Sequence, residues 1–113
     1  LDHIAALKPE KLVPGRGAAL QNAAEVAHGL EGTRSFVSEL YASVKAGAAA
    51  GKDLRAVYKD TFDKLQPKYG HWVIFNHCMP FDVTRAYDEA TQYADPRIWT
   101  AERDIEMWKS LET

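Results

Sequence analysis

The sequence TRSFVSELYASV at residues 33–44 carries the pattern that decides the fold class. Its apolar side chains recur every three or four residues, which is the spacing of one face of an α-helix. They are Phe36, Val37, Leu40, Tyr41 and Val44. Thr33, in front of this run, is a residue type that caps helices. The stretch therefore predicts an amphipathic helix that begins at Thr33 and packs against other helices.

Three further helices are expected toward the C-terminus. Asp53, Asp82 and Thr100 each stand as a candidate N-cap before a run of apolar residues at helical spacing. The residues expected to face inward are Leu54, Val57, Tyr58, Thr61 or Phe62, and Leu65 in the first helix, Val83, Ala86, Tyr87 and Ala90 in the second, and Ile105, Trp108 and Leu111 in the third. Pro67 should end the first of these helices, and Asp95-Pro96 predicts a turn.

The N-terminal part of the chain predicts two helices around a short strand. Leu1–Leu7 has the spacing of the last turns of a helix, and Lys11–Val13 forms a very short strand. Residues 18–28 are rich in helix formers, and Gly29 or Gly32 is a natural end for that helix. The whole chain is thus predicted to be mainly α, a small bundle of about five helices with one short N-terminal strand.

The sequence YGHWVIF at residues 69–75 fits two kinds of structure. Its bulky side chains favour a strand by propensity. A lone strand, however, would leave its backbone groups without partners. We therefore expect a buried helix at residues 69–75.

Composition narrows the class of protein. The 113 residues leave room for one modest core, and 14 basic against 16 acidic residues give a net charge of −2. This balance argues against general attraction to nucleic acid or to an anionic membrane. The single Cys78 fits a reducing compartment, and no apolar run reaches the roughly 20 residues that span a bilayer. The chain begins with Leu1 rather than Met, so we expect a cytoplasmic piece of a longer protein.

One motif points to a known family. A short strand, a Pro-Gly-x-Gly loop and a helix are the order in which α/β hydrolases present a side chain at the end of a sheet. The sequences LDHIAAL at 1–7 and KLVPGRG at 11–17 resemble the late segment of metallo-β-lactamase-fold hydrolases, where a helix precedes a strand that ends in a Pro-Gly-His-Gly loop. Residues 33–65 resemble the helical C-terminal extension of that family, and HCMPFDVTRAYDEA at 77–90 is similar to the closing helices of one soluble subgroup.

This resemblance implies a division of the chain and a role. Residues 1–17 would be the end of a hydrolase-like α/β domain, and residues 18–113 a helical C-terminal domain. The helical domain would cover one side of the active site, contact the N-terminal catalytic domain and mediate contacts between subunits of a homo-oligomer. In the intact parent, a zinc-bound hydroxide would attack a small ester, thioester or lactam carbonyl. The fragment alone would bind no cofactor and hydrolyse nothing.

The loop departs from the family at the residue that matters most. The family's histidine ligates the second metal ion, and this chain has Arg16 in its place. A guanidinium stays protonated and has no lone pair to offer zinc. Arg16, with the backbone of Gly15 and Gly17, is therefore predicted to bind substrate at the rim of the site. Either the parent keeps one metal and Arg16 supplies the missing positive charge, or the parent has lost catalysis.

Other reactive side chains are better explained by structure. His71, His77 and Cys78 are of the types that ligate zinc, but residues six apart on a helix point in different directions and no second cluster completes the set. Adjacent residues such as His77 and Cys78 rarely align as base and nucleophile. His3 and His28 are isolated. We expect no metal ligand and no catalytic residue in this chain.

The carboxylates near the C-terminus also have ordinary explanations. Asp82 is expected to cap a helix, and Asp88 and Glu89 to lie on its solvated face. Arg85 is expected to form an ion pair rather than to hold substrate.

Two other functions remain open. The chain could be a free-standing helical interaction or dimerisation module, in which the Pro-Gly-Arg-Gly loop is only a turn. Its aromatic residues are Tyr69, Trp72, Phe75, Phe81, Trp99 and Trp108, mostly expected in the core. It could also be a small ligand-binding bundle with a pocket between Trp72, Phe81 and Trp108.

Overall fold

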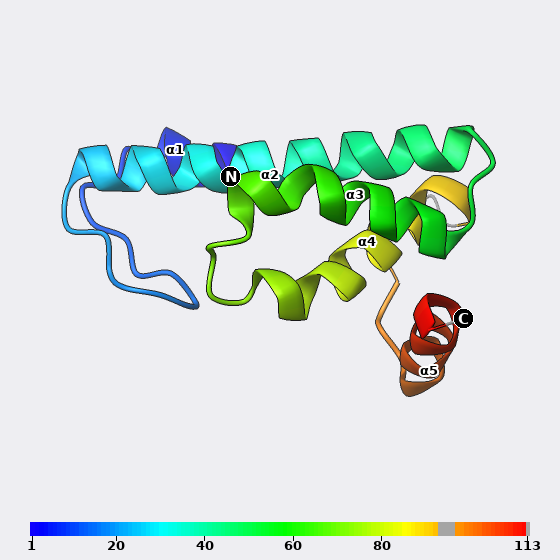
Figure 1. Cartoon of the computed structure of the whole chain (residues 1–113). Helices are drawn as coiled ribbons and strands as arrows, with labels where there is room; N and C mark the ends of the chain where they lie inside the picture. Colours follow the sequence, from blue (N-terminus) through cyan, green and yellow to red (C-terminus); the bar gives the residue numbers. More distant parts are fainter. Residues whose placement is uncertain (93–96, 113) are drawn as a thin grey trace. The chain divides into compact units, whose positions relative to one another are not determined.

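The computed structural model describes residues 1–92 and 97–112 and confirms a mainly α fold (Figure 1). Its helices are α1 (Asp2–Ala6), α2 (Ala23–Ala49), α3 (Leu54–Tyr69), α4 (Phe75–Thr91) and α5 (Ala101–Glu112). The chain divides into two compact units, Leu1–Ser38 and Glu39–Thr113, with the boundary inside α2. The predicted boundary after residue 17 concerns a relation to another protein, and it stays a prediction.

The predicted strand at Lys11–Val13 is not formed. Within the described residues, Leu12 makes an isolated antiparallel bridge with Leu20, in which the two backbone N–H···O distances are 3.1 and 2.8 Å. A single bridge provides too few hydrogen bonds to define a strand, and no sheet lies in the described chain for it to join.

Polar side chains fix the start of α2 at a later residue than the sequence predicted. The helix begins at Ala23 rather than Ala18, since the Asn22 Oδ1 accepts a hydrogen bond from the Glu25 backbone N–H at 2.9 Å. The Glu25 carboxylate in turn accepts from the backbone N–H of Gln21 at 2.7 Å. This reciprocal arrangement resembles a capping box and satisfies donors that the helix itself leaves unpaired.

The predicted break at Gly29 or Gly32 is wrong, and Thr33 is not an N-cap. Helix α2 passes through all three residues without interruption. The Thr33 hydroxyl donates to the carbonyl of Gly29 at 3.0 Å, a bond that a threonine makes inside a helix. Gly29 and Gly32 each lower the stability of the helix by about 1 kcal/mol relative to alanine. A long helix with packed neighbours remains stable despite that loss.

The core of the second unit comes from four helices. Its buried apolar residues are Leu40, Val44, Leu54, Val57, Leu65, Tyr69, Phe75, Met79, Val83, Ala86 and Met107. Between α2 and α3, Gly47 lies so close to Val57 that an added Cβ would stand 2.8 Å from its Cγ2. Nearby, the Ser43 and Thr61 hydroxyls are 2.9 Å apart and share a hydrogen bond. Small side chains thus allow the two helices to approach closely.

The predicted N-cap of α3 is confirmed, whereas the helix predicted at residues 69–75 is wrong. Asp53 accepts a hydrogen bond from the Ala56 backbone N–H at 2.8 Å, as a cap does. The helix ends at Tyr69, two residues beyond Pro67. Residues 70–74 form turns, closed by the bond from the Trp72 N–H to the Tyr69 carbonyl at 2.9 Å. These turns form backbone hydrogen bonds within the segment, so the backbone groups find partners without a strand or a continuous helix.

Helix α4 begins earlier than predicted and contains the residue that was expected to cap it. It starts at Phe75 and passes through Pro80, which is buried, and Asp82, which is therefore not its N-cap. Proline at position 80 removes a hydrogen bond to the carbonyl of Asn76. Asn76 is exposed, so water can take that place.

The final helix has the predicted cap but a different buried face. The Thr100 hydroxyl accepts from the Arg103 backbone N–H at 3.2 Å, which confirms the cap. Met107 is fully buried, while Ile105 and Trp108 remain 54% and 41% exposed. The prediction that Ile105 faces inward is therefore wrong, and the same prediction for Trp108 holds only in part. The turn predicted at Asp95-Pro96 lies outside the described residues.

Candidate functional site

The second unit contains a hollow of about 220 Å³ beside α4 and α5. Its walls include Arg85, Asp88, Glu89, Trp99, Glu102 and Arg103. Helix α4 supplies the first three of these residues, and α5 with the segment before it supplies the rest. Arginine and carboxylate side chains therefore face one another across a small partly apolar recess.

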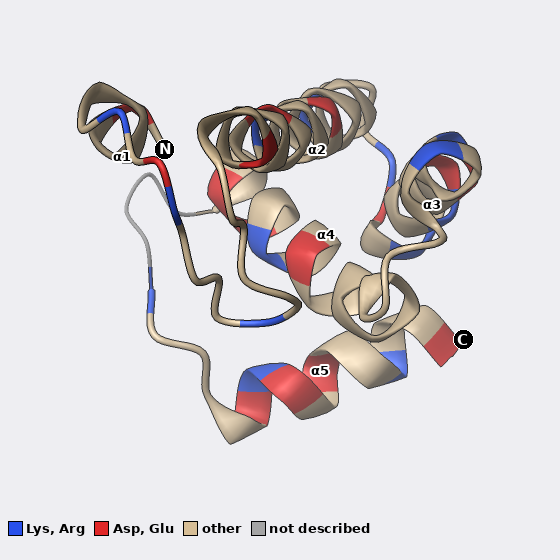
Figure 2. Ribbon diagram, turned by 90° about the vertical axis from the view of Figure 1, so that its left-hand side faces the viewer, with Lys and Arg blue, Asp and Glu red and all other residues tan. Residues whose placement is uncertain are grey.

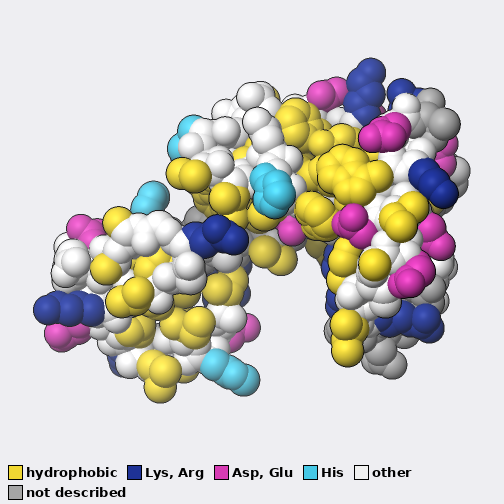
Figure 3. Space-filling model, turned by 90° about the horizontal axis from the view of Figure 1, so that it is seen from below, with side chains coloured by type: hydrophobic (Ala, Val, Ile, Leu, Met, Phe, Trp, Pro, Cys, Tyr) yellow, Lys and Arg dark blue, Asp and Glu magenta, His cyan; other side chains and the backbone are white. Residues whose placement is uncertain are grey.

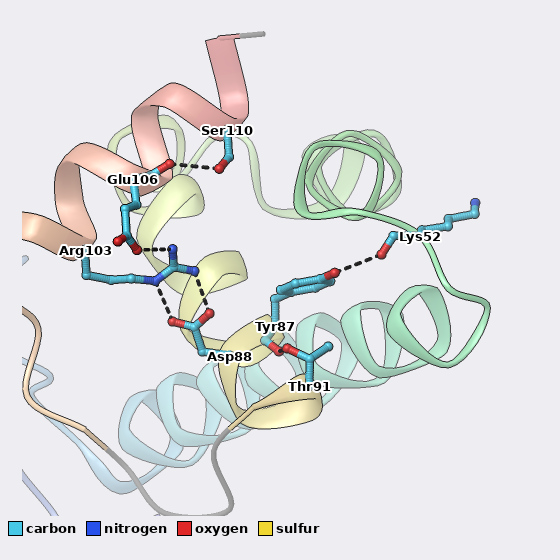
Figure 4. A network of polar contacts seen from close by, with 7 residues as sticks. All are labelled: Lys52, Tyr87, Asp88, Thr91, Arg103, Glu106 and Ser110. Atoms are coloured by element: carbon cyan, nitrogen blue, oxygen red, sulfur yellow. Dashed lines mark hydrogen bonds and ion pairs between the residues drawn. The ribbon is translucent and has the colours of Figure 1, made fainter.

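Asp88 and Arg103 join α4 to α5 through a two-point ion pair (Figure 4). The guanidinium donates from Nε to Oδ2 at 2.8 Å and from Nη2 to Oδ1 at 2.6 Å. The Asp88 side chain is 9% exposed, so its prediction as part of a solvated face is wrong. Hydrogen bonding to Asp88 raises the pKa of Arg103 above its usual value. The guanidinium also lies 3.3 Å from Glu106, and its main role is structural.

Arg85 forms an ion pair, as predicted. Its Nε donates to Glu89 at 2.8 Å, one helical turn further along α4. Its Nη1 donates to the backbone carbonyl of Arg97 at 2.8 Å and so fixes the chain just before α5. Arg85 thus holds the wall of the hollow in place.

Aromatic rings make contacts next to the hollow. Phe81 meets Trp99 and Trp108 edge to face, with centroids 5.8 and 6.2 Å apart, and His77 lies 6.0 Å away on α4. Trp72 meets Tyr69 edge to face at 5.0 Å. Two members of the predicted pocket, Phe81 and Trp108, are therefore in contact. The pocket itself stays a prediction.

The second unit holds a partly buried carboxyl group, that of Asp82, whose loss of solvation is not offset by a hydrogen bond or an ion pair with the described residues. Asp82 is partly buried on α4, and burial raises its pKa above the usual 3.8. Its carboxylate forms no hydrogen bond or ion pair with the part of the chain that the structure describes. In contrast, Glu39 of α2 bonds to Lys68 and Tyr69 of α3, which lowers the pKa of Glu39.

The candidate zinc ligands lie on two elements. His71 is exposed in the turns before α4, while His77 is exposed and Cys78 half-buried on α4. Among residues 1–92 and 97–112, no three His, Cys, Asp or Glu side chains are grouped to hold a metal ion.

The predicted substrate-binding loop lies in the first unit. Gly15, Arg16 and Gly17 are exposed, and Gly17 has a φ of +92°, a conformation that glycine adopts without strain. An added Cβ at Gly15 or Gly17 would meet nothing within 4 Å. Arg16 contacts no described residue through a hydrogen bond or ion pair. The loop is therefore uncovered on this chain, and its role stays a prediction.

The site between α4 and α5 could hardly be predicted from sequence patterns. Asp88 and Arg103 are 15 positions apart on different helices, so no helical spacing links them. The only local signal was Thr100, whose capping role places Arg103 in the first turn of α5.

Comparisons with known proteins do not assign this site. No protein-family model matches the chain, and no curated protein matches it significantly. Within the described residues, none of the helices combines the length and apolar character required to cross a membrane.

Proposed function

We propose that this chain is the helical portion of a metallo-β-lactamase-fold hydrolase, that it packs against the catalytic domain, and that it hydrolyses nothing alone. The observation that carries this proposal is the poor burial of the first unit. Among residues 1–38, all of which the structure describes, Val26 alone is buried. Leu7 and Val13 are 80% and 82% exposed. Units below about 40 residues rarely fold without extra support, so this one needs a covering partner.

The backbone groups beside the Leu12–Leu20 bridge also favour a catalytic domain as the covering partner. Leu12 uses its N–H and carbonyl to bond with Leu20. In an antiparallel pair, the neighbouring residues direct their own N–H and carbonyl groups to the opposite side. For Lys11 and Val13, these groups make no backbone hydrogen bond with the described residues. The segment can therefore add to the edge of a sheet in a catalytic domain.

Within this proposal, Arg16 binds an anionic group of the substrate at the rim of the parent's active site. Its guanidinium is free of intramolecular partners in the described chain, and the flanking Gly15 and Gly17 leave the surrounding space open. Zinc would be held by residues of the parent, since Arg16 offers no lone pair. Whether the parent retains one metal or has lost catalysis is decided by its other ligands. A cytoplasmic location, suggested by the single Cys78, belongs to the same proposal.

The coding sequence in front of residue 1 tests the proposal. A His-x-His-x-Asp-His cluster after a predicted strand would support it, and purified longer protein should then bind zinc. A start codon shortly before residue 1, with no such cluster, would contradict it.

The second candidate is an interaction or dimerisation module. Exposed apolar side chains on the second unit favour it: Val73 is fully exposed and Ile98 is 92% exposed. Hydrophobic side chains also reach the surface between charged ones in Figure 3. Sedimentation of the 113-residue chain tests the dimerisation module. A monomer would contradict it, whereas a dimer agrees with both candidates, because the hydrolase domain is also proposed to mediate subunit contacts.

A further inference from the structure

Helix α5 is held in the core of the second unit by a single buried side chain. Met107 is fully buried, and it is the one buried residue among Ala101–Glu112. By contrast, α3 has five buried residues and α4 has seven. Charged residues recur along α5 in Figure 2, and most of its residues are exposed. Since burial of apolar surface is the main force that holds a helix in place, α5 is held less firmly than α3 and α4.

Two arginines supply most of the polar contacts between α4 and α5. Arg103 of α5 donates two hydrogen bonds to Asp88 of α4, and Arg85 of α4 donates one to the carbonyl of Arg97, just before α5. A buried ion pair adds little net stability, because the hydration that its charges lose offsets much of their attraction. These contacts therefore fix the position of α5 but add less stability than an apolar interface would.

The ring of Phe81 on α4 is covered by tryptophans that belong to the α5 side of the contact. Trp99 directly precedes α5 and Trp108 lies within it, and both meet Phe81 edge to face. Detachment of α5 would remove both tryptophans and uncover one side of the Phe81 ring. A helix of 12 residues is only marginally stable alone in water, so α5 would lose its helical hydrogen bonds once it is detached.

We propose that residues 97–112 form a releasable strap, which detaches from α3 and α4 as one unit while the other helices of the second unit stay folded. Detachment separates Asp88 from Arg103, withdraws Met107 from the core and uncovers Phe81. Both members of the ion pair then become hydrated, so the open state contains no buried unpaired charge from this pair. This inference does not depend on the proposed hydrolase role.

Native-state hydrogen exchange of the 113-residue chain in low concentrations of urea tests the proposal. After correction for intrinsic rates, we expect the amides of Ile105, Met107 and Leu111 to exchange equally fast, and at least about tenfold faster than the amide of Val44 in α2. About 1 M urea should accelerate exchange at Val44 at least about fivefold, because that amide requires unfolding of the whole unit. The same urea should change the three α5 rates by less than about twofold, because release of the strap exposes little surface.

Two neighbouring carboxylates of α4 provide a variant and its matched control. Asp88→Ala leaves Arg103 without its main partner only in the closed state, so it should accelerate exchange of the α5 amides about 30-fold. Glu89→Ala breaks a more exposed pair with Arg85 and should accelerate them less than about fivefold. Both variants should keep the helical circular dichroism of the parent chain.

Three results would overturn the proposal. Exchange of the α5 amides that matches Val44 in rate and in urea response would mean that α5 unfolds only with the whole unit. A gradient along α5, with Leu111 fast and Ile105 slow, would indicate fraying from the C-terminus rather than release of a strap. Equal acceleration by the Asp88 and Glu89 variants would show that the ion pair with Arg103 does not hold α5 closed.

Discussion

At the scale of single residues, the Asp88–Arg103 pair is the strongest polar link between α4 and α5. Asp88→Ala removes both hydrogen bonds and leaves a guanidinium that is only 23% exposed without its main partner. We expect the free energy of unfolding to fall by about 2–3 kcal/mol, measured by urea denaturation. Glu89→Ala breaks a more exposed pair with Arg85 and should cost less than about 1 kcal/mol. Similar losses in the two variants would show that Asp88 contributes no more than a surface ion pair.

Unlike Asp88, the Asp82 carboxylate is expected to lower the stability of the folded protein at neutral pH. Burial raises its pKa in the folded state above the usual 3.8, so the charged form is disfavoured by folding. Above the folded pKa this carboxylate destabilises the protein, and the effect disappears below pH 3.8, where both states are protonated. Asp82→Asn should therefore raise the unfolding free energy at neutral pH and leave it unchanged in acid. A variant that is less stable at neutral pH would indicate a partner for the carboxylate.

At the scale of elements, two glycines of α2 should respond with opposite signs. A Cβ at Gly47 would stand 2.8 Å from a methyl group of Val57, which is fully buried and cannot move easily. Gly47→Ala should destabilise by about 1–2 kcal/mol despite the better helix propensity of alanine. At Gly29 the nearest atom is the end of the flexible Leu20 side chain, at 3.0 Å. Gly29→Ala should stabilise by about 0.5 kcal/mol. Thermal unfolding of both variants checks the signs, and two stabilised variants would refute the close α2–α3 packing.

Short sequence patterns predicted the caps of two helices correctly but placed other helix boundaries wrongly, and each outcome has a physical reason. The caps at Asp53 and Thr100 were predictable because a cap bonds within three residues of itself. Continuity of α2 through Gly29 was not, because it depends on packing along the whole helix. Asp82 was wrongly predicted as an N-cap, because α4 begins at Phe75 and passes through both Pro80 and Asp82.

The buried face of α5 and the candidate site depend on contacts between distant parts of the chain. Apolar spacing favoured Ile105 and Trp108, yet Met107 is the residue that packs against the core. Its position follows from the Asp88–Arg103 pair and from the contact of Phe81 with Trp108, which join α5 to α4. No spacing within α5 reveals those partners.

At the scale of the whole molecule, the two units differ in how well they are packed. The second unit has a core shared by four helices, whereas Val26 is the one buried side chain in the fully described first unit. The Pro-Gly-Arg-Gly loop and the exposed Val13 belong to the poorly packed unit. This contrast supports the proposal that the first unit belongs beside a catalytic domain.

Hydrogen exchange on the 113-residue chain alone and on the chain joined to the proposed catalytic domain tests this account most directly. In the chain alone, we predict fast exchange at Lys11 and Val13, whose N–H groups make no backbone hydrogen bond with the described residues, and slow exchange at Leu65 and Val83, which lie in the core. With the catalytic domain present, the amides of Lys11 and Val13 should exchange at least about 100-fold more slowly, because they would then pair with the edge of its sheet. Unchanged exchange at these amides in the two proteins, or slow exchange already in the chain alone, would contradict the claim that the first unit depends on a catalytic domain.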